Sequence, residues 1–339
     1  MKYRTLGRSG AVVSTYALGT MTFGSETPEP EAARQLSEYT ARGGNLIETA
    51  DVYSGGESER IVGRWLGTLD EQARANIFLA TKGRFPVGVE PRDSGNSRRH
   101  LRRALEGSLS RLGVDHVDLY QLHAWDPLTP LEESIGFLED AVSSGKISYA
   151  GLSNFTGWQI AKATALAAGR VPLISLQPQY NLLVREVEWE IVPASIDGGL
   201  GILPWSPLGG GWLTGKYTAT EAPTGATRLG EDPERGVEAY DRRSARERTW
   251  TTLAALTEIA AARDVPLSQV ALAWLHDRPG VTSVILGART VIQLTENLGA
   301  SDVELTADEA VRLDQASDPV AADYPYGGPG REQRSRTVD

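Results

Sequence analysis

The chain of 339 residues contains no cysteine. This absence excludes disulfides, iron–sulfur clusters and zinc sites built from thiolates. Histidine is scarce as well, and the four histidines stand far apart, at positions 100, 116, 123 and 276. Metal sites rich in histidine use short, regular spacings, so we expect the protein to hold no metal.

Basic residues and long apolar runs are also few. Lysine and arginine number 34 against 44 aspartates and glutamates, which gives a net charge of −10. This negative balance argues against a nucleic-acid partner, whose phosphates it would repel. No apolar run approaches the roughly 20 residues of a membrane-spanning helix, and the N-terminal sequence MKYRTLGRSG lacks the apolar segment of a signal peptide. We therefore expect a cytoplasmic protein without a membrane partner, and nothing here indicates its oligomeric state.

Strand-like and helix-like segments alternate along the chain. The opening sequence YRTLGRSGAVVS predicts a hairpin that turns between Gly7 and Gly10. Strands are then expected at 17–19, 45–48, 78–82, 117–122, 147–152, 173–177, 201–204 and 283–286. Helices are expected at 31–42, 57–67, 97–112, 130–143, 158–168, 187–197, 245–263, 267–276 and 290–299. This alternation is typical of a parallel sheet with helices packed on it.

The eight expected strands match the number that closes a (β/α)8 TIM barrel. A doubly wound open sheet is the alternative, but its G-x-G-x-x-G fingerprint is absent. We expect one barrel domain over residues 1–317 with an N-terminal hairpin. The polar, breaker-rich residues 218–244 predict a long loop after the seventh strand, on the face of the barrel that carries active sites. Residues 318–339, rich in proline, glycine and arginine, predict a loosely packed tail.

Chemically capable residues stand at the ends of three neighbouring strands. Glu48 ends the second strand and Tyr53 follows five residues later, whereas Lys82 ends the third strand and His123 the fourth. Neighbouring strands lie ~5 Å apart, and barrel enzymes collect their reactive groups at these ends, so the four side chains could form one cluster.

Such a cluster has the chemistry that carbonyl reduction needs. The pKa of a tyrosine is ordinarily about 10, and a nearby ammonium such as that of Lys82 lowers it toward neutral pH. Glu48 would keep the lysine charged, and His123 would hold a substrate carbonyl oxygen. Taken singly, each residue has another interpretation. Lys82 could form a Schiff base in an aldolase, Tyr53 could line a pocket, His123 could satisfy a backbone group, and Glu48 could be only the ion-pair partner of Lys82.

Aromatic residues are candidates for a substrate pocket. Phe23, Trp125 and Trp212 are expected to line it, with Tyr180 as a further candidate. Trp158 and Trp274 lie in helical patterns, which predict core positions.

The chain resembles the aldo-keto reductases, and most of all their bacterial and potassium-channel β-subunit-like branches. The matching motifs are LGTMTFG (18–24), TADVYSGGESE (49–59), ATK (80–82), SLSRLGVDHVDLYQLH (108–123), GKISYAGLSNF (145–155), LQPQYNLL (176–183), PWSPLGGGWLTGKY (204–217) and ILGARTVIQLTENLGA (285–300). The resemblance implies a catalytic tetrad at Glu48, Tyr53, Lys82 and His123. The family has aspartate in the position of Glu48, and Asp51 does not fill that position by register.

The resemblance also implies a nicotinamide dinucleotide, NADP(H) rather than NAD(H), extended across the barrel mouth. Ser153, Asn154 and Gln177 would hold its carboxamide, and Trp205 would stack on its ring. The rest of the site, as far as the pyrophosphate, would be formed by Gly19, Thr20, Met21, Ser206, Leu208, Gly210 and Lys216. The 2′-phosphate end would be bound by Gly287, Arg289, Gln293 and Asn297. The residues themselves agree in part, because amides at the start of a helix near 290 and the Arg289 guanidinium both suit an anion, although a plain surface helix would look the same.

The function implied is NADPH-dependent reduction of an aldehyde or ketone, with Tyr53 as proton donor. The alternative is a cofactor-binding regulatory or sensor subunit with vestigial catalysis, which the glutamate at position 48 favours. No residue pattern selects the carbonyl substrate.

Overall fold

The computed structural model describes residues 1–225, 227–234 and 236–335. Ala226 and Arg235 of the expected loop and residues 336–339 of the expected tail lie outside the described residues.

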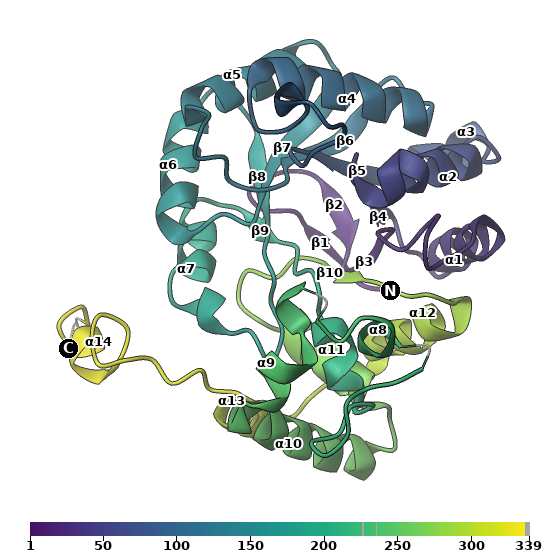
Figure 1. Cartoon of the computed structure of the whole chain (residues 1–339). Helices are drawn as coiled ribbons and strands as arrows, with labels where there is room; N and C mark the ends of the chain where they lie inside the picture. Colours follow the sequence, from purple (N-terminus) through teal and green to yellow (C-terminus); the bar gives the residue numbers. More distant parts are fainter. Residues whose placement is uncertain (226, 235, 336–339) are drawn as a thin grey trace.

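Eight parallel strands form the centre of the molecule, surrounded by helices (Figure 1). The strands are β3 (Tyr16–Gly19), β4 (Leu46–Glu48), β5 (Phe78–Gly83), β6 (Val117–Leu122), β7 (Ile147–Ser153), β8 (Leu173–Gln177), β9 (Gly201–Ile202) and β10 (Val284–Leu286). Each pairs with the next in the chain, and β10 pairs with β3. The ring closes where the amide of Ile202 donates to the carbonyl of Gly280 at 2.9 Å and the amide of Ile285 donates to Pro204 at 3.0 Å. The predicted (β/α)8 barrel is confirmed.

Helices follow the strands as the hydrophobic spacing predicts. They are α1 (Glu29–Ala41), α2 (Glu57–Leu66), α4 (Arg98–Leu112), α5 (Leu131–Ser143), α6 (Gly157–Ala167), α7 (Ile191–Asp197), α11 (Leu267–His276) and α12 (Val291–Leu298). Further helices are α3 (Glu71–Ala75), α10 (Glu247–Arg263), α13 (Ala307–Ala316) and α14 (Gly328–Glu332). No helix among the described residues is both long and apolar enough to cross a membrane.

The N-terminal hairpin is present as β1 (Tyr3–Thr5) and β2 (Val12–Ser14), an antiparallel pair. Its turn lies against the amino ends of β8 and β9, where the amide of Arg8 donates to Gly199 at 2.7 Å. A β-carbon on Gly7, whose φ is +58°, would come within 2.3 Å of the Ile174 carbonyl oxygen, so only glycine fits this turn. The hairpin therefore closes the end of the barrel opposite the carboxyl ends of the strands.

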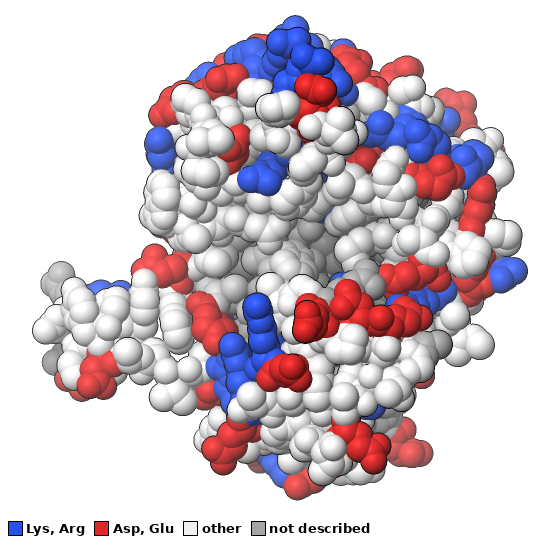
Figure 2. All heavy atoms as spheres, in the orientation of Figure 1, with Lys and Arg blue, Asp and Glu red and all other residues white. Residues whose placement is uncertain are grey.

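The long loop after β9 carries α8 (Arg228–Glu231) and α9 (Tyr240–Ser244). A buried ion pair between Glu238 and Arg243, with a separation of 3.2 Å, fixes the described part of this loop. Arg243 also donates to the carbonyl of Leu183 at 2.8 Å, which ties the loop to the segment after β8. The face shown in Figure 2 is hollowed at the centre of the ring, and the atoms around this hollow are mostly uncharged.

Candidate active site

The barrel interior changes from apolar to polar along the strands. Leu46, Phe78, Ala80 and Leu119 belong to one buried apolar cluster inside the ring. Because successive side chains of a strand point to opposite faces, the interior positions on β5 are Phe78, Ala80 and Lys82. The same alternation takes β4 from Leu46 to Glu48. On these two strands the charged side chains of the interior, Glu48 and Lys82, therefore stand at the carboxyl ends.

Lys82 is fully buried and has a partner for each of its three ammonium protons. Its Nζ donates to the Tyr53 hydroxyl at 2.9 Å and to the Thr49 carbonyl at 2.8 Å. The third partner is the carboxylate of Glu48, with which Lys82 forms an ion pair. The extra methylene of glutamate thus still permits contact with the lysine. Gln177 adds a hydrogen bond from its Nε2 to Glu48 Oε1 at 3.3 Å.

The buried ion pair sets the protonation of this group. Burial alone would lower the pKa of Lys82, but Glu48 and Tyr53 hold it above its ordinary value. An ammonium that stays charged is a poor nucleophile, which argues against the Schiff-base interpretation of Lys82.

Tyr53 differs from the expectation in one respect. Burial and the nearby Glu48 carboxylate raise the pKa of Tyr53 to about 12, although Lys82 acts in the opposite direction. The expected lowering of the Tyr53 pKa toward neutral pH was wrong for the protein without ligand, because the desolvation of the phenolate outweighs the attraction of the ammonium. Tyr53 is therefore a fully protonated donor at neutral pH.

His123 lies beside the tyrosine. The two ring centroids are 5.9 Å apart in an edge-to-face arrangement, and the Phe85 ring also meets the imidazole edge-to-face, with 4.5 Å between the centroids. Burial, Lys82 and Arg84 lower the pKa of His123 well below its ordinary value, so the ring is neutral. A neutral imidazole can donate one hydrogen bond to a carbonyl oxygen. The four predicted catalytic residues thus lie together in the structure.

The residues expected at the nicotinamide end form a hydrogen-bonded network next to the tetrad. Ser153 Oγ donates to the Gln177 carbonyl at 2.9 Å, and Trp205 Nε1 donates to Asn154 Oδ1 at 3.0 Å. Asn154 Nδ2 in turn donates to the carbonyl of His123 at 2.9 Å. The network fixes the half-buried Trp205 ring at the edge of the barrel mouth.

Three cations gather at the expected phosphate end. Burial lowers the pKa of Lys216, and the charges of Arg289 and Arg228 lower it further. Arg289 stands just before α12, whose N-cap is Thr290, and a β-carbon at Gly287 would meet no atom within 4 Å. A cluster of repelling cations beside an open backbone fits an anionic phosphate group. In the structure Arg289 forms ion pairs with Glu26 at 2.6 Å and Glu231 at 2.8 Å.

Other residues expected in the cofactor site have different surroundings. Gln293 Oε1 accepts a hydrogen bond from the Arg289 amide at 2.9 Å, and Gly210 adopts a φ of +67° in the turn after β9. Leu208 packs partly buried on the main core. Gly19, Thr20 and Asn297 are buried, whereas Met21 is 39% exposed.

The aromatic residues depart from the expected pocket. Phe23 and Trp212 are fully buried in the core, and Trp212 packs on Tyr240 of the long loop with ring centroids 5.6 Å apart. The structure thus places neither ring at a pocket surface. Trp125 is half-buried and contacts Trp158 with a centroid distance of 5.2 Å. The core position predicted for Trp158 is wrong, since its side chain is 60% exposed near the start of α6.

Two further aromatic predictions concern residues away from the tetrad. Tyr180 is buried, and its hydroxyl donates to Glu188 at 2.8 Å, so it does not face the hollow either. Trp274 is fully buried, and its predicted core position is confirmed.

The structure also shows residues near the tetrad that the sequence patterns did not single out. Arg84 and Phe85 follow Lys82 after one intervening glycine, Gly83; Phe85 contacts the His123 ring and Arg84 contributes to the lowered pKa of His123. Asp51 is buried beneath the site, and neither of its carboxylate oxygens has a hydrogen-bond partner among the described residues. The sequence feature that could have identified Arg84 is its position two residues after Lys82, just beyond the end of the same strand.

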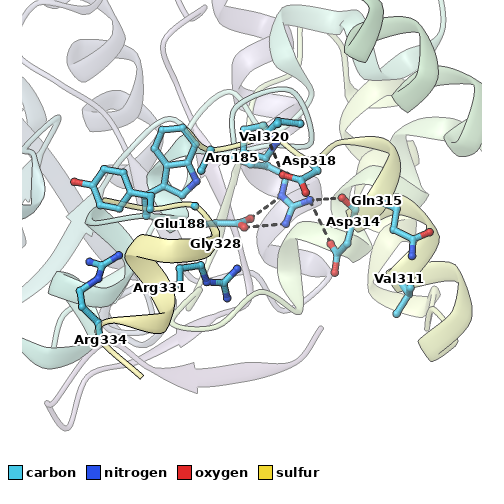
Figure 3. Close-up of a pocket in the computed structure, with 15 residues that line it drawn as sticks. Arg185, Glu188, Val311, Asp314, Gln315, Asp318, Val320, Gly328, Arg331 and Arg334 are labelled. Atoms are coloured by element: carbon cyan, nitrogen blue, oxygen red, sulfur yellow. Dashed lines mark hydrogen bonds and ion pairs between the residues drawn. The ribbon is translucent and has the colours of Figure 1, made fainter. Parts of the chain in front are cut away.

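A separate cavity of about 660 Å³ lies between the C-terminal segment and the barrel. Figure 3 shows Arg185 in this cavity, pairing with Glu188 and Asp314, together with the side chains of Arg331 on helix α14 and of Arg334 just after that helix. Tyr326 stacks on Trp189 with ring centroids 5.5 Å apart. None of the residues that line this cavity belongs to the tetrad or to the expected cofactor site.

Comparison with known proteins agrees with the geometry. The model of the aldo/keto reductase family matches residues 16–318. The chain is 38% identical over 316 residues to an uncharacterized oxidoreductase, YrpG, of Bacillus subtilis (strain 168), a match that covers 90% of this chain and 92% of that protein. It is 37% identical over 311 residues to a probable voltage-gated potassium channel subunit beta of Oryza sativa subsp. japonica, covering 89% and 92%. It is 31% identical over 346 residues to a versiconal hemiacetal acetate reductase of Aspergillus parasiticus, covering 95% and 98%.

Proposed function

Because the chain belongs to the aldo-keto reductase family, we propose that it is an NADPH-dependent enzyme that reduces an aldehyde or ketone to the alcohol, with Tyr53 as the proton donor. The observation that carries this proposal is the contact between Lys82 Nζ and the Tyr53 hydroxyl at 2.9 Å. Such a contact stabilises the phenolate that remains once the proton has left.

Each member of the tetrad has a distinct task in this mechanism. The nicotinamide cofactor, when bound, supplies the hydride that reduces the carbonyl carbon. His123 donates a hydrogen bond to the carbonyl oxygen and holds it near Tyr53. The Tyr53 proton passes to that oxygen as negative charge develops on it, and Lys82 stabilises the phenolate. Glu48 keeps Lys82 charged and fixes its position.

The preference for NADP(H) rests on the cluster of Lys216, Arg228 and Arg289. Burial lowers the pKa of Lys216, and repulsion from Arg289 and Arg228 lowers it further; a doubly charged 2′-phosphate would relieve that repulsion. NADH lacks this phosphate and would gain less from the cluster.

The test compares the protein with its Tyr53→Phe variant on a panel of aldehydes and ketones, following the loss of NADPH absorbance. We expect the variant to lose at least about 1,000-fold in kcat, in line with removal of an essential proton donor. Its affinity for NADPH, measured by quenching of tryptophan fluorescence, should stay within about twofold. Full turnover in the phenylalanine variant would remove Tyr53 from the mechanism.

A second candidate function is that of a cofactor-binding regulatory subunit. It is favoured by the 37% identity to the protein named as a probable potassium channel subunit beta. This candidate predicts tight NADPH binding with negligible turnover on the whole panel, in the parent protein as well as in the variant.

A further inference from the structure

Arg84 stands in the loop that follows β5, two residues beyond the catalytic Lys82. Its carbonyl accepts a hydrogen bond from the amide of Gly95 at 2.8 Å, which fixes the base of the loop. The preceding Gly83 carbonyl accepts from the amide of His123 at 3.1 Å. Arg84 is therefore bonded into the same strand ends that position the tetrad.

The guanidinium of Arg84 lies over the ring of Phe85, with 5.0 Å between Cζ and the ring centroid. The same ring contacts the imidazole of His123 at 4.5 Å. Arg84, Phe85 and His123 thus form a continuous series of contacts, in which Phe85 meets the imidazole edge-to-face. The positive charge is close enough to the imidazole to lower the pKa of His123.

This half-buried guanidinium forms no ion pair with the described residues, although its charge helps to lower the pKa of the nearby Asp126 carboxyl. Its Nε is buried and makes no hydrogen bond there. The carboxylate of Asp126 is nearby, but it accepts hydrogen bonds from the Asn96 amide at 2.7 Å, the Leu128 amide at 3.0 Å and the Thr129 hydroxyl at 2.6 Å. Asp126 is therefore committed to fixing its own loop.

Other arginines of comparable burial are paired. Arg111 contacts Glu59 at 2.6 Å, and Arg248 contacts Glu186 at 2.9 Å. A buried donor that is left without an acceptor destabilises a protein, and it does so more strongly when the group is charged. An arginine retained under these conditions beside a catalytic histidine is most simply explained by an anion that binds there.

We propose that Arg84 binds an anionic group, a carboxylate or a phosphate, on the carbonyl substrate itself. This inference rests on the proposed function, and it narrows the substrate to aldehydes or ketones that carry negative charge. The anion is distinct from the phosphates of the dinucleotide, because the residues expected to bind that cofactor follow β7, β8, β9 and β10 or stand just after β3, whereas Arg84 follows β5.

The geometry also determines the effect on the reaction. A guanidinium that holds one end of the substrate leaves the carbonyl oxygen to His123 and Tyr53. Because the hydrogen bond between Arg84 and the anion exists before and during the chemical step, its loss should raise KM more than it lowers kcat.

The test uses three matched aldehydes: 4-carboxybenzaldehyde, 4-formylphenyl phosphate, and the neutral ester methyl 4-formylbenzoate. We expect kcat/KM for one or both anionic aldehydes to exceed that for the ester by about 10-fold or more in the parent protein. The anion with the larger advantage identifies the charge that the site accepts. In Arg84→Gln this advantage should disappear, mainly through KM, so that the kcat/KM values for the two anions fall to about that for the ester. Arg84→Lys should restore part of it.

Arg92→Gln is the control, since Arg92 is exposed in the same loop and should leave all three kcat/KM values unchanged. Equal turnover of the ester and both anions by the parent protein, or an equal loss on all three in Arg84→Gln, would overturn the inference while leaving the proposed function intact.

If the parent protein reduces none of the three aldehydes, the proposed function fails on this panel and calorimetry decides the role of Arg84. Binding of 4-carboxybenzaldehyde or 4-formylphenyl phosphate to the parent protein, weakened at least about 10-fold in Arg84→Gln, would support the anion site. Equal affinity in the two proteins would overturn it.

Discussion

The Glu48 carboxylate and the Lys82 ammonium form an ion pair at the carboxyl end of the barrel, and both side chains are buried. The lysine belongs to β5 and the glutamate to the neighbouring β4. Removing one partner of such a pair leaves an uncompensated buried charge, which destabilises a protein by roughly 3–5 kcal/mol. The pair therefore couples the stability of the barrel to the position of the group that stabilises the Tyr53 phenolate.

Two substitutions of Glu48, one that removes its carboxylate and one that keeps it, should show whether the reaction needs the negative charge beside Lys82. In Glu48→Ala we expect kcat to fall about 100-fold or more, because Lys82 loses the carboxylate that fixes it. Glu48→Asp should retain or exceed the parent activity. It keeps the negative charge, and aspartate is the residue that the resemblance to the family implies at this position. Steady-state kinetics with NADPH and a neutral aldehyde provide the measurement. Unchanged turnover in the alanine variant would show that Glu48 has no part in the reaction.

The pH dependence of the reaction should follow from the protonation of Tyr53. Burial and Glu48 raise its pKa to about 12, so the donor remains protonated below that value. Carbonyl reduction should therefore lose no activity through deprotonation of Tyr53 between about pH 6 and pH 9. Oxidation of the alcohol needs the phenolate, and its rate should rise with pH over the same range. Initial rates in both directions test this, and a fall in reduction with an apparent pKa near 8 would contradict it.

Asp51 should make the folded protein less stable as the pH rises. Burial and the nearby Glu59 raise the pKa of Asp51 to about 7 from an ordinary value of 3.8. The folded state therefore favours the protonated acid. Its contribution is fully present below the ordinary pKa, declines as the pH rises toward 7, and is constant above. The total change is on the order of 4 kcal/mol.

Asp51→Asn stays neutral at every pH and should raise the melting temperature. The gain over the parent protein should grow between about pH 5 and pH 7.5, because only the parent pays to ionise a buried acid. Asp115→Asn is the matched control at an exposed position and should show no such trend. Thermal unfolding at several pH values decides the matter, and a gain independent of pH would mean that Asp51 is not the titrating group.

The barrel and its tetrad could be predicted because both depend on local patterns. Strands alternate with helices at regular spacing. The carboxyl ends of parallel strands lie at the same edge of the sheet, so side chains at these ends come together. The positions of Lys82 and His123 could be predicted from these strand ends alone. The capping box of α13, in which Thr306 and Glu309 exchange hydrogen bonds, also fits the sequence pattern S/T-x-x-E, although we did not predict this helix.

Burial of single aromatic residues could not be predicted in this way. Trp158 and Trp274 both fit helical spacing, yet α6 turns Trp158 toward solvent while Trp274 is enclosed beside Tyr180. Trp212 is covered by Tyr240 and Trp250, which are distant in the sequence. The pKa of Tyr53 likewise depends on desolvation, a property of the folded surroundings rather than of neighbouring residue types.

The ion pairs of Arg289 give a last prediction, on the choice of cofactor. Two carboxylates, Glu26 and Glu231, contact this guanidinium in the structure. A 2′-phosphate that binds Arg289 must compete with them, whereas a 2′-hydroxyl need not. Arg289→Gln should therefore weaken NADPH binding about 10-fold and leave NADH binding nearly unchanged. Glu231→Gln should have the opposite sign, strengthening NADPH binding by a few-fold at low salt, because one competing carboxylate is removed.

Titration of each variant with NADPH and with NADH, followed by tryptophan fluorescence, measures both affinities. Arg263→Gln is a suitable control, because Arg263 also pairs with a carboxylate, that of Glu309. This pair joins α10 to α13 and does not belong to the expected cofactor site. Its cofactor affinities should equal those of the parent protein. A loss in Arg289→Gln that is the same for NADPH and NADH would place this arginine on a part that the two cofactors share, and the preference for NADPH would then require another residue.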